Sequence, residues 1–342
     1  MVRKYFGMAN SAGGLANLMD NNLSGLKTIY TISGDSKKQK TEILDGVLKK
    51  AEMSGDVECV ISPFDIKCID AVIIRSKGLC VVDRDCLCGE IAAKNIDLDG
   101  ANHKRTDLSE KEKWAIGEMY KCYDDAKKIH DEWEKIYMKN MDYDKLEAYE
   151  KGVLDQLFAG QKGLSGKKNY HRFFGSSTPD GAVNYIDNLT ENLAARYFIK
   201  GRAGTGKSTF LRRVAREANE KGFDTEIYYC GFDKNSLDMV IVPELDFCVF
   251  DSTAPHEMFP KSERDTILDF YEESGLLGTD EKYEKELLDV ETRYNQKMAE
   301  GMAFLRLFKL YMKEKEYHLA KHLNEKEFLM LKDAVIKEVF QN

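Results

Sequence analysis

The sequence contains 342 residues, of which 59 are acidic and 51 basic, so its formal net charge is −8. This excess of negative charge argues against a protein that coats nucleic acid. The length predicts about two domains, and an apolar fraction of 43% is sufficient to bury a core in each. No apolar run approaches the roughly 18 residues that cross a bilayer, so we expect a cytoplasmic protein that does not enter the membrane.

Eight cysteines are spread along the chain, and several stand inside apolar, strand-like runs, where reduced cysteines pack as small hydrophobic residues. We therefore expect no disulfide scaffold. Cys86 and Cys88 form one Cys-x-Cys pair without a second pair at the spacing of zinc ligands, and this favours a structural role.

The first predicted unit spans about residues 5–83, and a charged tail follows at about residues 109–158. In this tail apolar side chains recur at three- and four-residue steps, which indicates an amphipathic helix. His130 has no second histidine three or four residues away, so we interpret it as a packing or surface residue. Residues 161–170 are rich in glycine and lysine, which predicts a linker.

The second half of the chain repeats the first. The segment 5–83 recurs at about 173–251, and each copy ends in an aspartate after an apolar run. A second charged, helical tail follows at about residues 262–340. We therefore predict an α/β protein of two domains with mainly parallel sheets, each followed by a helical hairpin. The predicted boundaries are 1–160 for the first domain with its tail, 161–170 for the linker and 171–342 for the second domain with its tail.

One motif in the second half indicates a ligand. Residues 201–208, Gly-Arg-Ala-Gly-Thr-Gly-Lys-Ser, match the phosphate-loop pattern G-x-x-x-x-G-K-[ST], follow a strand-like run at 196–199 and open a helical segment. The glycines let backbone amides turn toward phosphate oxygens, and Lys207 supplies a positive charge for the β- and γ-phosphates. The predicted nucleotide-binding residues are Gly201, Arg202, Ala203, Gly204, Thr205, Gly206, Lys207, Ser208 and Thr209.

A Mg²⁺ ion bound with the nucleotide needs a carboxylate, usually at the end of a neighbouring strand. Asp251 ends the apolar run 245–251, so we predict that Ser208 and Asp251 ligate Mg²⁺. Ser252 stands where ring-forming ATPases commonly have a second acid, so another residue must orient the attacking water. The predicted catalytic residues are Lys207, Asp251 and Asp233.

Asp233 is the favoured water-orienting candidate because α/β sheets bind ligands at the carboxyl ends of their strands. Glu244 and His256 are alternatives that we place near the same edge of the sheet, and the segment 252–256 directly follows the strand that ends at Asp251. From its position alone, this segment is a candidate sensor of the γ-phosphate. Arg202 and Arg212 are candidates to complete the site.

The first repeat carries a damaged copy of the loop at residues 34–41. Lys40 and Thr41 are kept, but Lys37 and Gln39 replace the second and third glycines. Side chains at these positions obstruct the phosphates or forbid the backbone angles that the loop needs. We expect the first half to keep the fold and to have lost, or greatly weakened, nucleotide binding.

The chain resembles a family of uncharacterised bacterial tandem P-loop ATPase-like proteins over nearly its whole length. The likeness rests on residues 198–209, on a segment similar to 236–245 and on Asp-Ser-Thr-Ala-Pro-His at 251–256, and it is most specific over 171–260. The resemblance implies two fused P-loop NTPase-like domains and ATP binding. The first half departs from the family pattern at the damaged loop.

These observations predict an ATP-binding protein, with Mg²⁺ as cofactor, that hydrolyses ATP in its second half. The first half is then a structural or regulatory partner through contact between the two halves. A small-molecule or nucleotide kinase, with its substrate bound near Asp233 and Asp238, is one alternative, and a nucleotide-gated binding protein with little turnover is another. We expect no membrane or nucleic-acid partner, and the sequence does not identify a protein partner.

Overall fold

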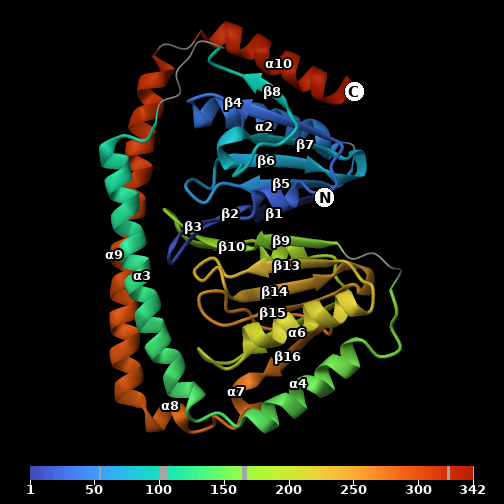
Figure 1. The fold of residues 1–342 in the computed structure, drawn as a ribbon, viewed down its shortest axis with the longest axis vertical. Coiled ribbons are helices and arrows are strands. Elements are labelled where there is room, and N and C mark those ends of the chain that lie inside the picture. The colour runs from blue at the N-terminus through green and yellow to red at the C-terminus, as the bar shows by residue number, and fades with distance from the viewer. Residues whose placement is uncertain (54, 101–106, 164–167, 322–323, 342) are drawn as a thin grey trace.

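The computed structural model describes residues 1–53, 55–100, 107–163, 168–321 and 324–341. Twelve strands form one continuous sheet, helices flank it, and two long helices run along one edge of it (Figure 1). The fold is therefore α/β, as predicted. Among the described residues, no helix combines the length and the apolar character that crossing a membrane requires.

The first half contributes six strands to the sheet, in the spatial order β1-β5-β6-β7-β4-β8. The strands are β1 (Val2–Phe6), β4 (Thr28–Ser33), β5 (Val57–Ile61), β6 (Ile69–Ile74), β7 (Leu79–Asp83) and β8 (Lys94–Asp97). A hairpin of β2 (Met8–Ser11) and β3 (Gly14–Asn17) and the helices α1 (Met19–Asn22) and α2 (Lys37–Glu52) complete this half. The buried face of α2 packs on the sheet through apolar residues that include Ile43 and Val47.

The second half has the same arrangement of strands, in the order β9-β13-β14-β15-β12-β16. Its elements are β9 (Asn169–Phe173), β10 (Gly175–Thr178), β11 (Gly181–Asn184), α5 (Ile186–Thr190), β12 (Ala195–Lys200), α6 (Lys207–Glu220), β13 (Thr225–Tyr229), β14 (Leu237–Val242), β15 (Phe247–Asp251) and β16 (Asp265–Asp269). In each half the third strand of the order, β6 or β14, runs antiparallel to both neighbours, and the other pairings within the half are parallel.

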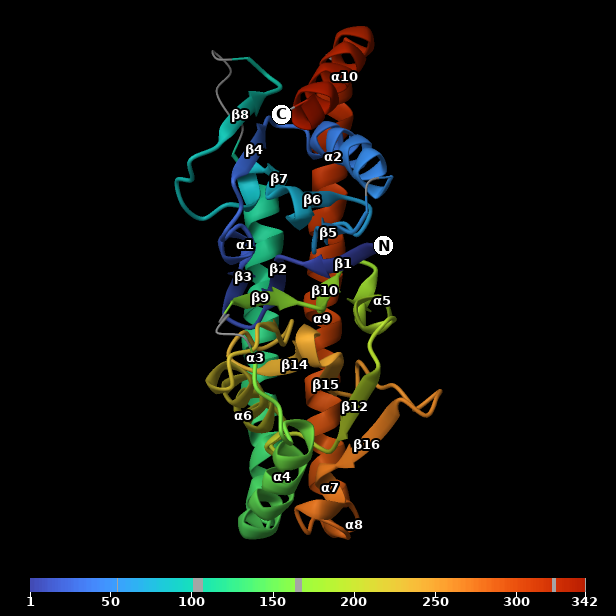
Figure 2. The same cartoon turned by 90° about the vertical axis from the view of Figure 1, so that its right-hand side faces the viewer.

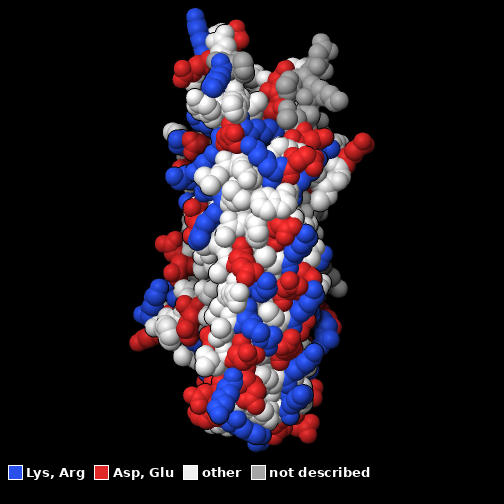
Figure 3. Space-filling model, turned by 90° about the vertical axis from the view of Figure 1, so that its left-hand side faces the viewer, with Lys and Arg blue, Asp and Glu red and all other residues white. Residues whose placement is uncertain are grey.

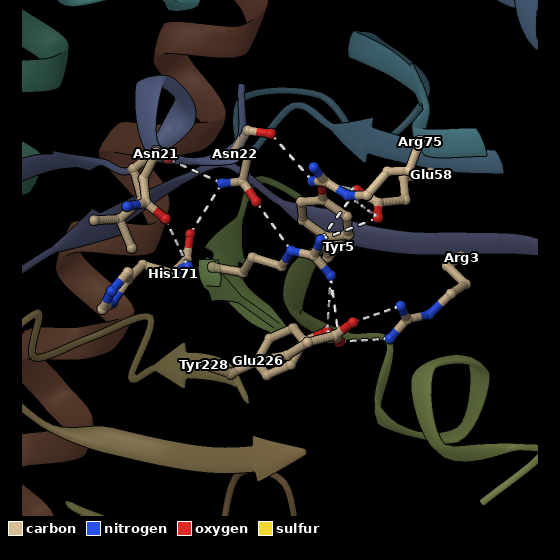
Figure 4. Close-up of polar contacts among 11 residues, drawn as sticks. Arg3, Tyr5, Asn21, Asn22, Glu58, Arg75, His171, Glu226 and Tyr228 are labelled. Atoms are coloured by element: carbon tan, nitrogen blue, oxygen red, sulfur yellow. Dashed lines mark hydrogen bonds and ion pairs between the residues drawn. The ribbon is translucent and has the colours of Figure 1, made fainter. Parts of the chain in front are cut away.

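The two halves meet at β1 and β9, which pair through Phe6 and Phe173. A buried ionic network crosses this junction (Figure 4). Arg172 on β9 is fully buried and contacts Glu58 on β5 at 3.1 Å and Glu226 on β13 at 3.3 Å. Arg75 also binds Glu58, and Arg3 binds Glu226 through two hydrogen bonds of 2.7 and 2.5 Å. One hydrophobic cluster likewise contains residues of both halves, so the halves share a core.

The helices that follow each half pack differently from the predicted hairpins. Helix α3 (Glu110–Met138) lies against α9 (Glu284–Ala320) of the other tail, and the two appear side by side in Figures 1 and 2. Ion pairs at opposite ends, Lys111 with Glu314 and Glu132 with Arg293, show that the pair is antiparallel. The hairpin prediction treated each tail separately, and local periodicity does not identify the partner of an apolar face.

The ends of the tails also cross over to the other half. Helix α4 (Tyr143–Leu157), from the first tail, packs in the core of the second half against α6. Helix α10 (Glu325–Gln341), from the second tail, packs on α2 so closely that a Cβ atom at Gly46 would lie 2.4 Å from Ile336. The short helices α7 (Phe270–Glu273) and α8 (Thr279–Lys282) precede α9. Of the predicted linker 161–170, residues 164–167 lie outside the described residues, and β9 begins at its end.

The seam between α3 and α9 is held by a small cluster of Met119, Tyr123 and Leu305, with Phe64 and Phe232 packed against it. Phe64 follows β5 and Phe232 follows β13, so the helix pair covers the carboxyl-terminal edge of the sheet in both halves. On the face shown in Figure 3, acidic and basic side chains are interspersed around a band of uncharged residues. The pair thus connects the loop regions at the two ends of the molecule.

Candidate functional site

The glycine-rich loop at residues 201–206 joins β12 to α6, in the strand, loop, helix order that the sequence predicted. Gly204 and Gly206 have φ angles of +77° and +84°, a region that favours glycine. Gly206 directly precedes the first residue of α6. The hydroxyl of Thr205 donates to the carbonyl of Arg202 at 2.9 Å and thus holds the loop in a closed turn.

Three predicted site residues lie together at the start of α6. The Nζ atom of Lys207 donates to the carbonyl of Arg202 at 2.7 Å and lies 3.6 Å from the Asp251 carboxylate at the end of β15. The hydroxyl of Ser208 accepts hydrogen bonds from the backbone of Leu237 at 2.9 Å and from Arg212 at 2.6 Å. The ammonium, the hydroxyl and the carboxylate therefore share one edge of the sheet.

Asp238 on β14 adds a buried carboxylate to this group. Burial, together with the negative charge of Asp251, raises the pKa of Asp238 to about 7. A nearby cation stabilises the charged form of such a buried carboxylate, because its positive charge offsets the loss of hydration. The sequence analysis named Asp238 only as a substrate neighbour in the kinase alternative; its counterpart in the repeat is Asp70.

Two arginines proposed to complete the site are held by other groups. Arg202 forms a 2.7 Å ion pair with Asp280 on α8 and lies over the ring of Tyr271. Arg212 contacts Ser208 and the carbonyl of Asn235. Arg202 is thus tied to α8, whereas Arg212 already contacts a residue of the predicted magnesium site.

The remaining candidates fall in different places. Asp233 lies beyond β13 at the expected edge, where it receives a backbone hydrogen bond from Asn235 and lies 3.5 Å from Lys127 on α3. Glu244 was wrongly placed, because β14 runs antiparallel and carries it to the opposite edge, where it accepts from the backbone of Asp224. His256 is half-buried with its ring edge-on to Phe174, which is a packing position.

The first half offers an internal comparison. The hydroxyl of Thr41 accepts from the backbone of Ile69, as Ser208 accepts from Leu237, and Lys40 pairs with Asp83 at 2.9 Å, as Lys207 faces Asp251. The positions therefore correspond. Helix α2, however, begins at Lys37, three residues earlier than the corresponding start of α6. The damaged loop thus forms a helical turn, because Lys37 and Gln39, which replace the two glycines, disfavour positive φ angles.

Side chains fill the centre of this first-half region. The Lys37 ammonium lies 2.6 Å from both Asp70 and Asp83, the counterparts of Asp238 and Asp251. The carboxylate of Glu316, near the end of α9, accepts from the backbone amide of Lys37 at 2.5 Å and from the hydroxyl of Ser36 at 2.7 Å. The Lys37 ammonium thus lies between the two aspartates, and the Glu316 carboxylate lies at the start of α2.

The second half has a related contact from the other tail. A Cβ atom at Gly204 would lie 2.9 Å from the carbonyl oxygen of Glu134 and 3.1 Å from its Cα, so the backbone of α3 touches the loop. Glu134 also lies 3.6 Å from His130. Burial raises the pKa of Glu134, although the charge of Lys127 acts in the opposite direction. Sequence reasoning missed Glu134, because α3 belongs to the first half of the chain.

Comparison with protein-family models, with curated proteins and with solved structures finds no match to this chain.

Proposed function

We propose that the second half binds a nucleoside triphosphate with Mg²⁺ at the glycine-rich loop and hydrolyses it, while the first half acts as a structural or regulatory partner. The observation that carries this proposal is the loop geometry. Two glycines with positive φ lead into α6, and the first two helical residues place an ammonium beside Asp251 and a hydroxyl next to Arg212. This combination suits phosphate better than a purely structural turn, which does not need the lysine and the serine.

The residues also fit a divalent cation. Asp238 is buried beside Asp251, and burial together with the negative charge of Asp251 raises its pKa even though the Lys207 ammonium acts in the opposite direction. In the first half the corresponding aspartates have the Lys37 ammonium between them. Oxygen ligands of this kind suit Mg²⁺, with Ser208 and Asp251 as the expected protein ligands. When bound, Mg²⁺ neutralises charge on the phosphates during transfer.

The protein groups have distinct roles in this proposal. The loop amides and Lys207 stabilise negative charge on the transferring phosphate, once Lys207 leaves the carbonyl of Arg202. Arg212 must also leave Ser208 if that hydroxyl is to contact Mg²⁺. Asp233, at the same edge of the sheet, is the candidate to orient water or an acceptor hydroxyl.

The test is a titration of the full-length protein with ATP, GTP and ADP, with and without Mg²⁺, combined with measurement of phosphate release. We expect one Mg²⁺-dependent site per chain, lost in Lys207→Ala and retained in Lys38→Ala, the exposed lysine at the first-half loop. Binding without release in the absence of an acceptor supports a kinase or a binding switch instead. Absence of binding in the wild-type protein refutes the proposal.

A further inference from the structure

The two tail helices meet the two loop regions in the same manner. Glu134 stands four residues before the end of α3, and Glu316 stands four residues before the end of α9. Each helix comes from one half and reaches the loop of the other half. Because α3 and α9 form an antiparallel pair, the two glutamates occupy corresponding positions relative to their loops.

The first half shows what such a glutamate does when it is fully engaged. Glu316 accepts from the amides of Lys37 and Lys38 and from the hydroxyl of Ser36. These donors lie at the start of α2, where the helix dipole favours negative charge. A carboxylate thus takes the place that a phosphate occupies at the start of such a helix.

In the second half the last turns of α3 lie against the glycine-rich loop at residues 201–206. The contact joins the backbone of Glu134 to Gly204, and an ion pair joins α3 to Asp233 through Lys127. The Glu134 side chain is about one-third exposed and lies near His130. The Cβ atom of Glu134 is therefore next to the loop that we propose to bind phosphate, and its carboxylate interacts electrostatically with Lys207, which directly follows that loop. Among the described residues, this carboxylate forms no hydrogen bond with a loop amide.

We propose that Glu134 belongs to the nucleotide site of the second half, where its carboxylate competes with the phosphates of a nucleoside triphosphate and sets the binding affinity. This inference rests on the proposed function, because it concerns the same loop. Phosphates that enter the loop come close to Glu134, so binding requires the end of α3 to move or the phosphates to approach a like charge. Burial, Asp131 and Asp233 raise the pKa of this carboxylate, while Lys127 and Lys207 act in the opposite direction and favour its charged form.

The first experiment compares ATP binding by wild-type protein and Glu134→Gln by calorimetric titration in the presence of Mg²⁺. We expect the variant to bind on the order of ten-fold more tightly, since it removes one like charge near the phosphates. Glu118→Gln is the matched control, because it makes the same change on α3 at a residue paired with Lys121. We expect no change in its affinity.

A second measurement does not depend on the Glu134 variant. The chain has two tryptophans, and Trp133 is next to Glu134, with its ring against Tyr294 of α9. In a Trp114→Phe background, which removes a half-exposed side chain, Trp133 reports on the end of α3. We expect its fluorescence to change when ATP binds.

The outcomes separate the two proposals. Tighter binding by Glu134→Gln together with a Trp133 response supports the inference. Equal or weaker binding by this variant, or ATP binding with unchanged Trp133 fluorescence, overturns the role of Glu134 and leaves the proposed function standing. If the wild-type protein does not bind ATP, the proposed function is refuted and this inference with it.

Discussion

The network at the junction of the two halves gives a strong prediction for stability. In Arg172→Leu, the fully buried guanidinium is lost and the carboxylates of Glu58 and Glu226 remain buried. Removing one partner of a buried ion pair costs about 3–5 kcal/mol. Glu58 keeps Arg75 and Glu226 keeps Arg3. We therefore expect the free energy of unfolding to fall by about 3 kcal/mol, near the lower limit of that range.

The dependence on pH supplies a second test of the same reasoning. Despite burial, the surrounding arginines hold the pKa of Glu58 and Glu226 below the ordinary value for glutamate. A lowered pKa in the folded state stabilises the protein above the unfolded-state pKa of about 4.3, and this stabilisation is lost as the pH falls below it. In Arg172→Leu both pKa values rise. The difference in stability between the two proteins is therefore largest near neutral pH and narrows toward pH 3.

The assay is equilibrium unfolding in urea, followed by circular dichroism, at several pH values. Arg293→Leu is a suitable control, because this arginine is 40% exposed and its ion pairs with Glu132 and Asp289 lie on the surface. We expect the control to lose less than about 1 kcal/mol at any pH. A loss below about 1 kcal/mol in Arg172→Leu, or a difference that does not change with pH, would contradict our account of the junction.

Three further predictions concern the tail helices and the loop. Gly301→Leu should separate α3 from α9, because a Cβ atom there would lie 2.5 Å from the ring of Tyr123; small-angle scattering and thermal unfolding measure the effect. Glu316→Ala should destabilise the protein by about 1–2 kcal/mol through loss of the acceptor at the start of α2, whereas the exposed Glu314→Ala should cost less in the same urea assay. Gly204→Ala should abolish ATP binding with the circular dichroism spectrum retained, because alanine disfavours φ of +77° and its Cβ meets Glu134; ATP binding at wild-type affinity would contradict this reasoning.

The repeat was the most informative feature of the sequence for the fold. Equivalent apolar runs ending in Asp83 and Asp251 predicted that the two halves share one fold, and the order of the strands is the same in both. The antiparallel course of β6 and β14 was not predicted, since a buried strand has the same apolar composition in either direction. This direction decides which edge each loop joins, and for that reason Glu244 was placed at the wrong one.

By itself the sequence determined the local features of this protein: the duplication, the glycine-rich loop before α6, and the loss of that loop where Lys37 and Gln39 replace glycine. Such features depend on backbone angles and on short-range periodicity, which neighbouring residues largely control. Only the tertiary structure decided that each tail crosses to the opposite half and brings Glu134 and Glu316 to the two loops. The apolar stripe of a helix shows that it must be buried but does not identify its partner, because burial of apolar surface is non-directional.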